Sequence, residues 1–409
     1  MHEDVYLKRN TPTYTYLYMF IIFEYFLISL FIYLYSVKVG ELGASVSGLP
    51  GGNDSQLYWT QIVNNFKIFK TSNMQNVTST SYTPIMSIIV SVIGILDPLV
   101  VRIVNLFVFY ALLFQVSSLL SFLSDKMGLS YQSNRSARNY LGAVFILYPA
   151  LIFSVCFGIG RDIWIYLAFI SVMKYSCKWL SYKHLIDAIF ILAWWIFLFS
   201  LRKYQAISVL LAGIIFLIFR RISFKSFLWL MLSSIFILFF WFTFFKSVEL
   251  PVVNMSLMDA LQFQSGYRTE FGTVVLVNYG SSDFMGAYST TNFPLFIIQY
   301  IYSFVCNMLS PLIWQFKSLQ LIVVGITEGF LIQFCIFMLM KKRELLKKII
   351  KSNPCFFFLL IQAIFWNVVI AFSNKNIGTG IRLRIPEFII FIVVYIIVKF
   401  KEKEDKNEG

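Results

Sequence analysis

An aspartate beside glycines is the first group along the chain that can do acid–base chemistry. Asp54 follows two glycines and an asparagine and precedes Tyr58. Glycines permit close approach of a backbone, and a carboxylate placed there can accept a proton from a hydroxyl as a general base. Glu270 is a second candidate for this role. A structural alternative stays open, because Asp54 is equally suited to cap a helix that starts at Ser55.

Arginines next to apolar segments form a second group with chemical potential. Arg161 precedes Asp162, and Arg202 follows an apolar run. The planar guanidinium suits two-pronged contact with phosphate or carboxylate. The alternatives are an interfacial ion pair between Arg161 and Asp162, and a side chain of Arg202 that only anchors a helix at the membrane surface.

A third arginine group lies near the last apolar segment. Arg382 and Arg384 follow two glycines and precede Pro386. We expect the proline to open a helix and the glycines to let both arginines face a phosphate group. Alternatively, the two arginines only cap that helix.

A long polar stretch carries further candidates. Tyr267 and Arg268 lie just before Glu270, and an apolar run over residues 293–313 ends next to Trp314. Such a run predicts an amphipathic helix in the membrane interface that guides a lipid-linked substrate. A helix that merely rests on the membrane is the equal alternative.

Three acids lie inside apolar segments: Glu24, Glu328 and Glu387. Carboxylates in such positions are functional candidates by default, although each can instead pair with an arginine or stay protonated.

These side chains need elements to position them, and the composition indicates membrane helices. Of the 409 residues 58% are hydrophobic, 19% aromatic and only 13% charged. Soluble domains have about 45–50% apolar and about 25% charged residues. A soluble protein is therefore excluded, and we expect an all-α polytopic membrane protein forming a single integral-membrane domain over residues 1–409.

Apolar segments of sufficient length predict about ten transmembrane helices. They cover residues 14–37, 99–123, 139–159, 162–180, 184–201, 203–219, 225–246, 318–340, 352–373 and 383–400. Two further apolar stretches, 83–96 and 293–313, are short or interrupted by proline, and we expect them to be re-entrant or interfacial.

The distribution of basic residues orients these spans. With both termini in the cytoplasm, 21 of the 34 lysines and arginines fall on the inner side, as the positive-inside rule requires. The first polar segment, 38–82, and the larger one, 247–317, then lie outside the cell membrane. The outer basic residues are rich in arginine, so the net charge of +14 points to an anionic lipid-linked substrate and not to nucleic acid.

The order of these motifs resembles that of the Wzy-type oligosaccharide repeat-unit polymerases of capsule and O-antigen synthesis, which are integral-membrane glycosyltransferases of the GT-C kind. The matching residues are Gly52-Asn53-Asp54-Ser55 with Tyr58, Arg102 with Asn105, Arg161-Asp162, Leu201-Arg202, Tyr267-Arg268, Pro311 with Trp314-Gln315, and Gly378-Thr379 with Arg382, Arg384 and Pro386. One departure is Asn53, which stands where many lipid-phosphate-sugar transferases have a second acid.

The resemblance implies polymerisation of oligosaccharide repeats carried on undecaprenyl diphosphate, a polyprenyl diphosphate, at the outer face of the cytoplasmic membrane. Arg202, Arg382 and Arg384 would stabilise the leaving diphosphate, with Arg161 and Arg268 assisting. Asp54 or Glu270 would be the base, and Tyr58, Tyr267 and Trp314 would stack on sugar rings. A flippase and a chain-length regulator are the expected partners.

Two other functions stay open. One is a GT-C transferase that adds a single sugar from a lipid-monophosphate donor, and the other is a flippase for lipid-linked oligosaccharides. The sequence contains no Walker A, GxGxxG or CxxC motif, so we expect no nucleotide, metal or other cofactor. Transporters commonly contain internal repeats, and none is recognisable in this sequence.

Overall fold

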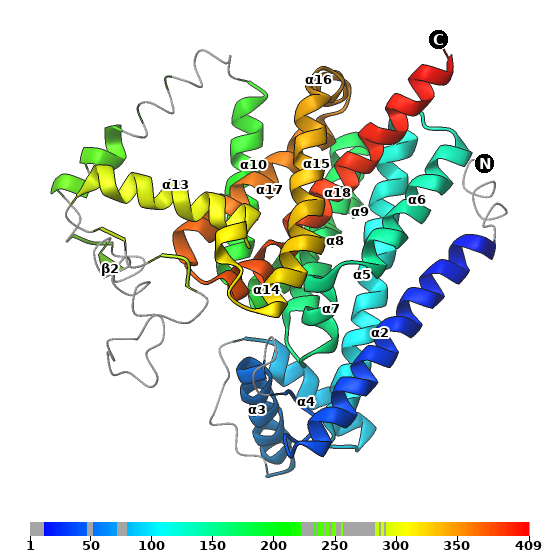
Figure 1. Cartoon of the computed structure of the whole chain (residues 1–409), viewed down its shortest axis with the longest axis vertical. Helices are drawn as coiled ribbons and strands as arrows, with labels where there is room; N and C mark the ends of the chain where they lie inside the picture. Colours follow the sequence, from blue (N-terminus) through cyan, green and yellow to red (C-terminus); the bar gives the residue numbers. More distant parts are fainter. Residues whose placement is uncertain are drawn as a thin grey trace. The chain divides into compact units, whose positions relative to one another are not determined.

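The structure of this chain is a computed structural model that is helical almost throughout. It describes residues 12–46, 52–71, 80–221 and 292–408, together with 229, 233, 236–240, 242–244, 248–250, 255–256, 283–285 and 288–289. Within these residues the exceptions are β1 (Glu249–Leu250) and β2 (Met255–Ser256), which pair antiparallel. The expected all-α class is confirmed (Figure 1).

The chain divides into two compact units. Unit 1 comprises Met1–Ile207, Phe330–Leu360 and Phe388–Gly409, and unit 2 comprises Ser208–Gly329 and Ile361–Glu387. The expectation of one membrane domain over residues 1–409 stays a prediction, because a unit of dense packing is not by itself an independently folding domain.

Unit 1 is built around a buried helix, α8. Its elements are α2 (Pro12–Lys38), α3 (Gly52–Thr71), α4 (Tyr82–Ile93), α5 (Pro98–Lys126), α6 (Tyr131–Ile146), α7 (Pro149–Cys156), α8 (Asp162–Tyr182), α9 (Leu185–Leu201), the start of α10 (Lys203–Phe219), α15 (Phe330–Lys341), α16 (Arg343–Ser352), the start of α17 (Pro354–Ser373) and the end of α18 (Ile377–Glu408). Apolar side chains on every face of α8 are buried, and α5 and α9 pack against it. Helix α2 packs along α5, α6 and α7 (Figure 1).

Local signals explain where the helices of unit 1 begin. Pro98 is the first residue of α5, and the Asp97 carboxylate accepts a hydrogen bond from the amide of Leu99 at 2.7 Å. Tyr33 of α2 donates to the same carboxylate at 3.1 Å. The cap therefore both starts α5 and ties it to α2.

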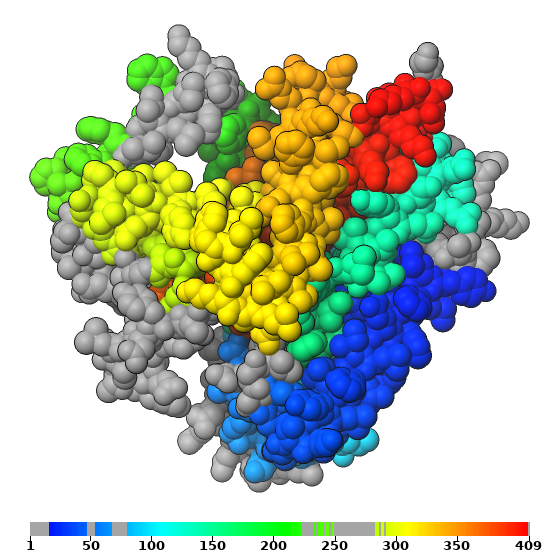
Figure 2. Space-filling view, in the orientation of Figure 1, coloured from blue at the N-terminus to red at the C-terminus, as the bar shows by residue number. Residues whose placement is uncertain are grey.

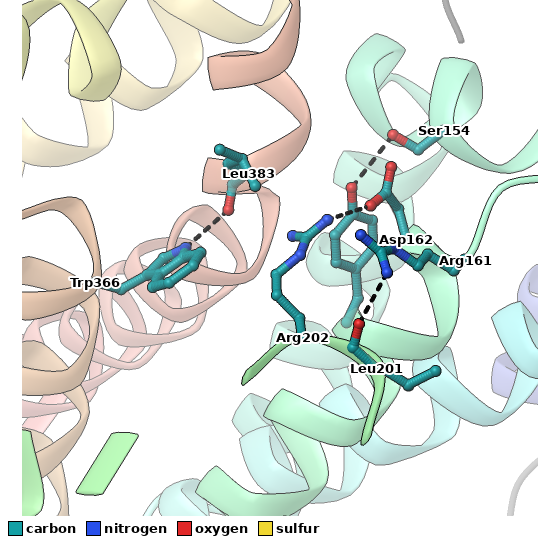
Figure 3. Close-up of polar contacts among 8 residues, drawn as sticks. Ser154, Arg161, Asp162, Leu201, Arg202, Trp366 and Leu383 are labelled. Atoms are coloured by element: carbon teal, nitrogen blue, oxygen red, sulfur yellow. Dashed lines mark hydrogen bonds and ion pairs between the residues drawn. The ribbon is translucent and has the colours of Figure 1, made fainter. Parts of the chain in front are cut away.

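Unit 2 contains most of α10, the helix α13 (Phe293–Leu309), the short turns η1 (Ile313–Gln315) and α14 (Leu319–Val324), the π-helical segment η2 (Gly325–Gly329), the end of α17 and the start of α18. An aromatic cluster around Phe242 and Tyr288 packs against α13 and Phe372 of α17. A second cluster centres on Trp366, whose indole donates to the carbonyl of Leu383 at 2.8 Å (Figure 3).

Four helices of the described chain are long and apolar enough to cross a membrane: Tyr16–Lys38, Pro98–Lys126, Leu319–Lys341 and Pro354–Ser373. A fifth is obtained if α6 and α7, which are bent by 64° at their junction, form one span. Membrane spans are thus supported, whereas the expected count of about ten is not.

Helix ends explain the difference in the number of spans. Four of the apolar helices, α4, α9, α10 and α13, have only 12 to 17 residues, and 17 residues reach about 25 Å against a hydrocarbon core of about 30 Å. Helix α8 carries Lys174 and Lys178, and α18 carries Arg384 and Glu387 within its apolar part. Most of residues 225–246 lie outside the described residues.

Candidate functional site

A short irregular segment, residues 157–161 between α7 and α8, is held by side chains from other helices. The amide of Ile159 donates to the Ser55 hydroxyl at 3.1 Å, and the Tyr82 hydroxyl donates to the carbonyl of Ile159. Asn105 donates to the carbonyl of Gly160 at 3.3 Å. Because these backbone groups are paired by side chains from α3, α4 and α5, the segment has a fixed place in unit 1.

Arg102 fixes the residue from which this segment departs. Its guanidinium donates to the carbonyls of Cys156 at 2.6 Å, Gly43 at 3.0 Å and Ala44 at 3.2 Å, and only 1% of the residue is exposed. All three of its nitrogens are thereby engaged with backbone. Arg102, which belongs to the motif order described above, therefore holds the end of α7 against the loop after α2.

At the other end of the segment the neighbours Arg161 and Asp162 contact the neighbours Leu201 and Arg202, the first of each pair with the first of the other and the second with the second. Arg202 Nη2 contacts the Asp162 carboxylate at 2.7 Å, and Arg161 Nη1 donates to the carbonyl of Leu201 at 3.1 Å (Figure 3). The ion-paired side chains of Arg202 and Asp162 are only 7% and 13% exposed. The carboxylate of Asp162 thus pairs with Arg202, and the pairing with its neighbour Arg161 that the sequence suggested is not the one observed.

This arrangement leaves guanidinium donors available. Arg202 Nε and Nη1 and Arg161 Nε are buried and have no hydrogen-bond partner among the described residues. An arginine has five N–H donors, and buried donors without acceptors are costly. An anionic group that accepted these donors would remove that cost, so the pair is suited to hold an anion.

Tyr58 of α3 lies next to the arginine pair. Burial raises the pKa of Tyr58 to about 12, and the charges of Arg161, Asp162, Asp54 and Arg202 add smaller effects of both signs. Tyr58 is therefore a neutral phenol at physiological pH. Four of the residues singled out from the sequence, namely Asp54, Tyr58, Arg161 and Arg202, are thus brought together in unit 1.

The aromatic side chains behind Tyr58 form a supporting row. The rings of Tyr58 and Tyr82 meet edge to face at 5.4 Å between centroids, and those of Tyr82 and Trp164 at 6.3 Å. Trp164 donates to Asn105 at 2.9 Å. Tyr82 and Trp164 were not identified as part of a site from the sequence, whereas Tyr58 and Asn105 belong to the motif order described above. The signal that could have revealed the row is this asparagine, which lies one turn from Arg102 in an apolar helix.

Asp54 lies four residues before Tyr58 on α3. It is exposed and lies in the first turn of α3, which begins at Gly52 and not, as the capping alternative assumed, at Ser55. An acid in a first turn interacts favourably with the helix dipole. The position suits a base that meets solvent-exposed substrate.

Arg384 lies in unit 2 in a different environment. Its guanidinium contacts Glu328 at 3.3 Å and the carbonyl of Asn307 at 3.5 Å, and the two charged side chains are 1% and 0% exposed. Glu328 belongs to η2, and π-helical turns often mark functional positions. This pair provides the partner of Glu328 that the sequence left open.

The expected geometry around Pro386 is wrong. Helix α18 begins at Ile377, where the Asn376 side chain accepts a hydrogen bond from the amide of Thr379 at 3.1 Å, and Pro386 lies inside the helix. The cap at Asn376 starts the helix nine residues before the proline, so Arg382 and Arg384 are part of its first turns. Arg382 is half-buried.

The other candidates are distributed as follows. Trp314 lies in η1 of unit 2 and is 69% exposed. Tyr267, Arg268 and Glu270 lie outside the described residues. Among the described residues no group of three or more histidine, cysteine, aspartate or glutamate side chains could hold a metal ion.

Comparisons with models of protein families, with curated proteins and with solved structures found no match to this chain.

Proposed function

We propose that this protein is a glycosyltransferase of the cytoplasmic membrane that polymerises oligosaccharide repeats carried on undecaprenyl diphosphate, in the synthesis of capsule, exopolysaccharide or O-antigen. The active face would be extracytoplasmic, with both termini in the cytoplasm. The resemblance of the motif order to Wzy-type polymerases suggests this reaction, and the helical, apolar chain is compatible with it.

The observation that carries the proposal is the arginine pair of unit 1. Arg202 and Arg161 keep three buried guanidinium nitrogens that find no acceptor among the described residues, next to a neutral phenol and an exposed carboxylate. A diphosphate is the kind of group that such donors bind, because it offers several charged oxygens in a compact space.

The proposed reaction uses these groups in one displacement. A hydroxyl oxygen of the incoming repeat bonds to the anomeric carbon of the growing chain, and its proton passes to the Asp54 carboxylate. The bond from that carbon to the diphosphate oxygen breaks, and the electron pair stays on the diphosphate. Arg202 and Arg161 stabilise this growing negative charge, and Tyr58 donates a hydrogen bond or stacks on a sugar ring.

The remaining candidates have roles outside the arginine pair of unit 1. Arg384 is paired with a buried glutamate, so we assign it a positioning role within unit 2 and not direct contact with diphosphate. Arg382 stays a proposed stabiliser of the diphosphate, and Glu270 stays the alternative base. Arg268, Tyr267 and Trp314 stay proposed substrate contacts.

The test is the analysis of lipid-linked intermediates in a host lacking the protein. We expect single complete repeats on the lipid at the outer face. A truncated repeat would instead indicate a transferase that uses a monophosphate donor, and complete repeats retained at the inner face would indicate a flippase. Either result contradicts the polymerase proposal.

The same host tests the arginine pair. An Arg202→Lys protein keeps the charge but loses the planar fork, and we expect a loss of polymer formation of about 100-fold or more. An Arg221→Lys protein, altered at an exposed arginine of unit 2, is the matched control and should polymerise normally.

A further inference from the structure

The most strongly basic helix of the described chain is α16, which joins two candidate spans. One residue, Lys342, separates Leu319–Lys341 from α16, and one residue, Asn353, separates α16 from Pro354–Ser373. A helix of 10 residues tied at both ends to membrane-crossing helices cannot leave the membrane surface. Its side chains therefore stay near the lipid headgroups, within the Debye length of about 8 Å at physiological ionic strength.

The two faces of α16 differ sharply in polarity. Leu345, Leu346, Ile349 and Ile350 lie on one side, and Ile349 is 1% exposed. The opposite side is exposed and carries the charged residues, which are Arg343, Glu344, Lys347, Lys348 and Lys351. Since the apolar side packs against the protein, the basic side faces outward. In Figure 2 the atoms of α16, coloured orange, lie at the surface and are not covered by other parts of the chain in this view.

Most of the positive charge on this helix lacks a compensating acid. Glu344 is the one acid among residues 341–351, and it contacts Lys347 at 3.0 Å and Arg343 at 3.6 Å. Lys341, Lys348 and Lys351 make no ion pair within the part of the chain that is described. The hydrogen bond from Lys347, with the other nearby cations, lowers the pKa of Glu344, which reports the positive potential of this face.

Three acids near the C-terminal end of α18 have partners other than the exposed cations of α16. Glu402 pairs with Lys342 and, at 3.1 Å, with Lys406. Glu404 accepts a hydrogen bond from the amide of Ser130 at 2.8 Å, and Asp405 contacts Lys401 at 3.1 Å. The Lys342–Glu402 contact also ties the residue before α16 to α18.

We propose that the exposed basic face of α16 binds the headgroups of anionic phospholipids and so anchors unit 1 at an anionic membrane surface. Charge complementarity supports this partner, because lysines and arginines near an anionic membrane surface are attracted to it. The confinement of α16 to the membrane surface favours a lipid over an acidic protein segment. This binding is independent of the proposed glycosyl transfer.

The test uses the full-length protein in lipid nanodiscs made of phosphatidylcholine with a minor fraction of phosphatidylglycerol. The protein is released from the nanodiscs, and the lipids that remain bound to it are identified by native mass spectrometry. We expect the wild type to retain phosphatidylglycerol preferentially, and Lys348→Gln/Lys351→Gln to lower that preference by about tenfold. Lys348→Arg/Lys351→Arg should retain it. At about 1 M ionic strength, where the Debye length is about 3 Å, the preference should largely disappear.

The matched control removes two exposed arginines elsewhere, Arg220→Gln/Arg221→Gln. It should keep the preference of the wild type. If the α16 variant retains phosphatidylglycerol as the wild type does, or if the control loses as much, the proposal is wrong. A second measurement compares the affinity of polyglutamate for the wild type in phosphatidylcholine nanodiscs with the affinity of phosphatidylglycerol for the wild type in the mixed nanodiscs. If polyglutamate binds more tightly, the partner is an acidic protein segment and the proposal is wrong.

Discussion

Arg202 shows how a buried charge is maintained in this protein. Its side chain is 7% exposed, and its guanidinium has one carboxylate partner among the described residues, Asp162, at 2.7 Å. Two of its nitrogens have no acceptor among the described residues. A buried guanidinium with a single partner depends strongly on that partner, because the energetic cost of leaving water is only partly offset. The pair is therefore sensitive to any change in Asp162.

We predict that Asp162→Asn lowers the free energy of unfolding by about 3–5 kcal/mol, because the Arg202 charge stays buried without its carboxylate. Denaturation in detergent micelles measures this. The double variant Asp162→Asn/Arg202→Gln should lose less than the single variant, since no unpaired charge remains. Asp54→Asn, at an exposed carboxylate of α3, is the control and should change stability by no more than about 0.5 kcal/mol. An Asp162→Asn protein as stable as the wild type would contradict this account.

At the scale of elements, the first turns of α18 depend on a close approach to α13. A Cβ atom on Gly380 would lie 3.0 Å from both Asn307 Oδ1 and Asn374 Nδ2. These two atoms are themselves hydrogen-bonded at 2.7 Å, and Asn307 donates back to the Asn374 carbonyl at 3.0 Å. Glycine at this position lets the helix start against the paired amides.

We predict that Gly380→Ala destabilises the protein by about 1–3 kcal/mol, because the methyl group pushes the paired amides apart. The matched control is Gly213→Ala in α10, where an added Cβ meets nothing within 4 Å. That variant should be neutral or more stable by up to about 1 kcal/mol. Thermal unfolding of both variants in one detergent is the measurement, and equal midpoints for the two would count against the close packing at Gly380.

The segment between α7 and α8 illustrates what can be inferred from local sequence. Arg161 and Asp162 are recognisable as candidates because charges are rare in an apolar setting. The hydrogen bonds between this segment and Ser55, Tyr82 and Asn105 are not readable from the sequence, because each joins positions more than fifty residues apart.

At the scale of the whole molecule, the property to test is which side of the membrane each loop occupies. The described helices include four to five that can cross a membrane. With the ten spans expected from the sequence, the charge distribution places the turn at Lys183 in the cytoplasm and the end of α3 outside. This assignment follows from the positive-inside rule.

We predict that a fluorescent protein inserted after Lys183 fluoresces, whereas alkaline phosphatase inserted after Thr71 is active, because the first folds in the cytoplasm and the second outside it. The exchanged insertions are the controls and should be inactive. The opposite pattern would reverse the orientation and remove the extracytoplasmic active face from the proposal.

The number of spans is a property that the composition alone overestimates. Windows of apolar residues do not register that α6 and α7 are separated by a 64° bend. They do separate α9 from α10, but each of these helices has only 17 residues and falls short of a full span. The bend occurs at Pro149, the first residue of α7, which cannot donate a helical hydrogen bond.

The sequence by itself determined that this chain is helical and built for a membrane, since apolar content and periodicity act locally and need no partner. It also identified Arg161, Arg202 and Asp54 as candidates, because polar residues stand out in an apolar chain. Only the tertiary structure decided which charges meet: Asp162 with Arg202, and Glu328 with Arg384. An ion pair depends on distances between segments far apart in the chain, and packing alone sets those distances.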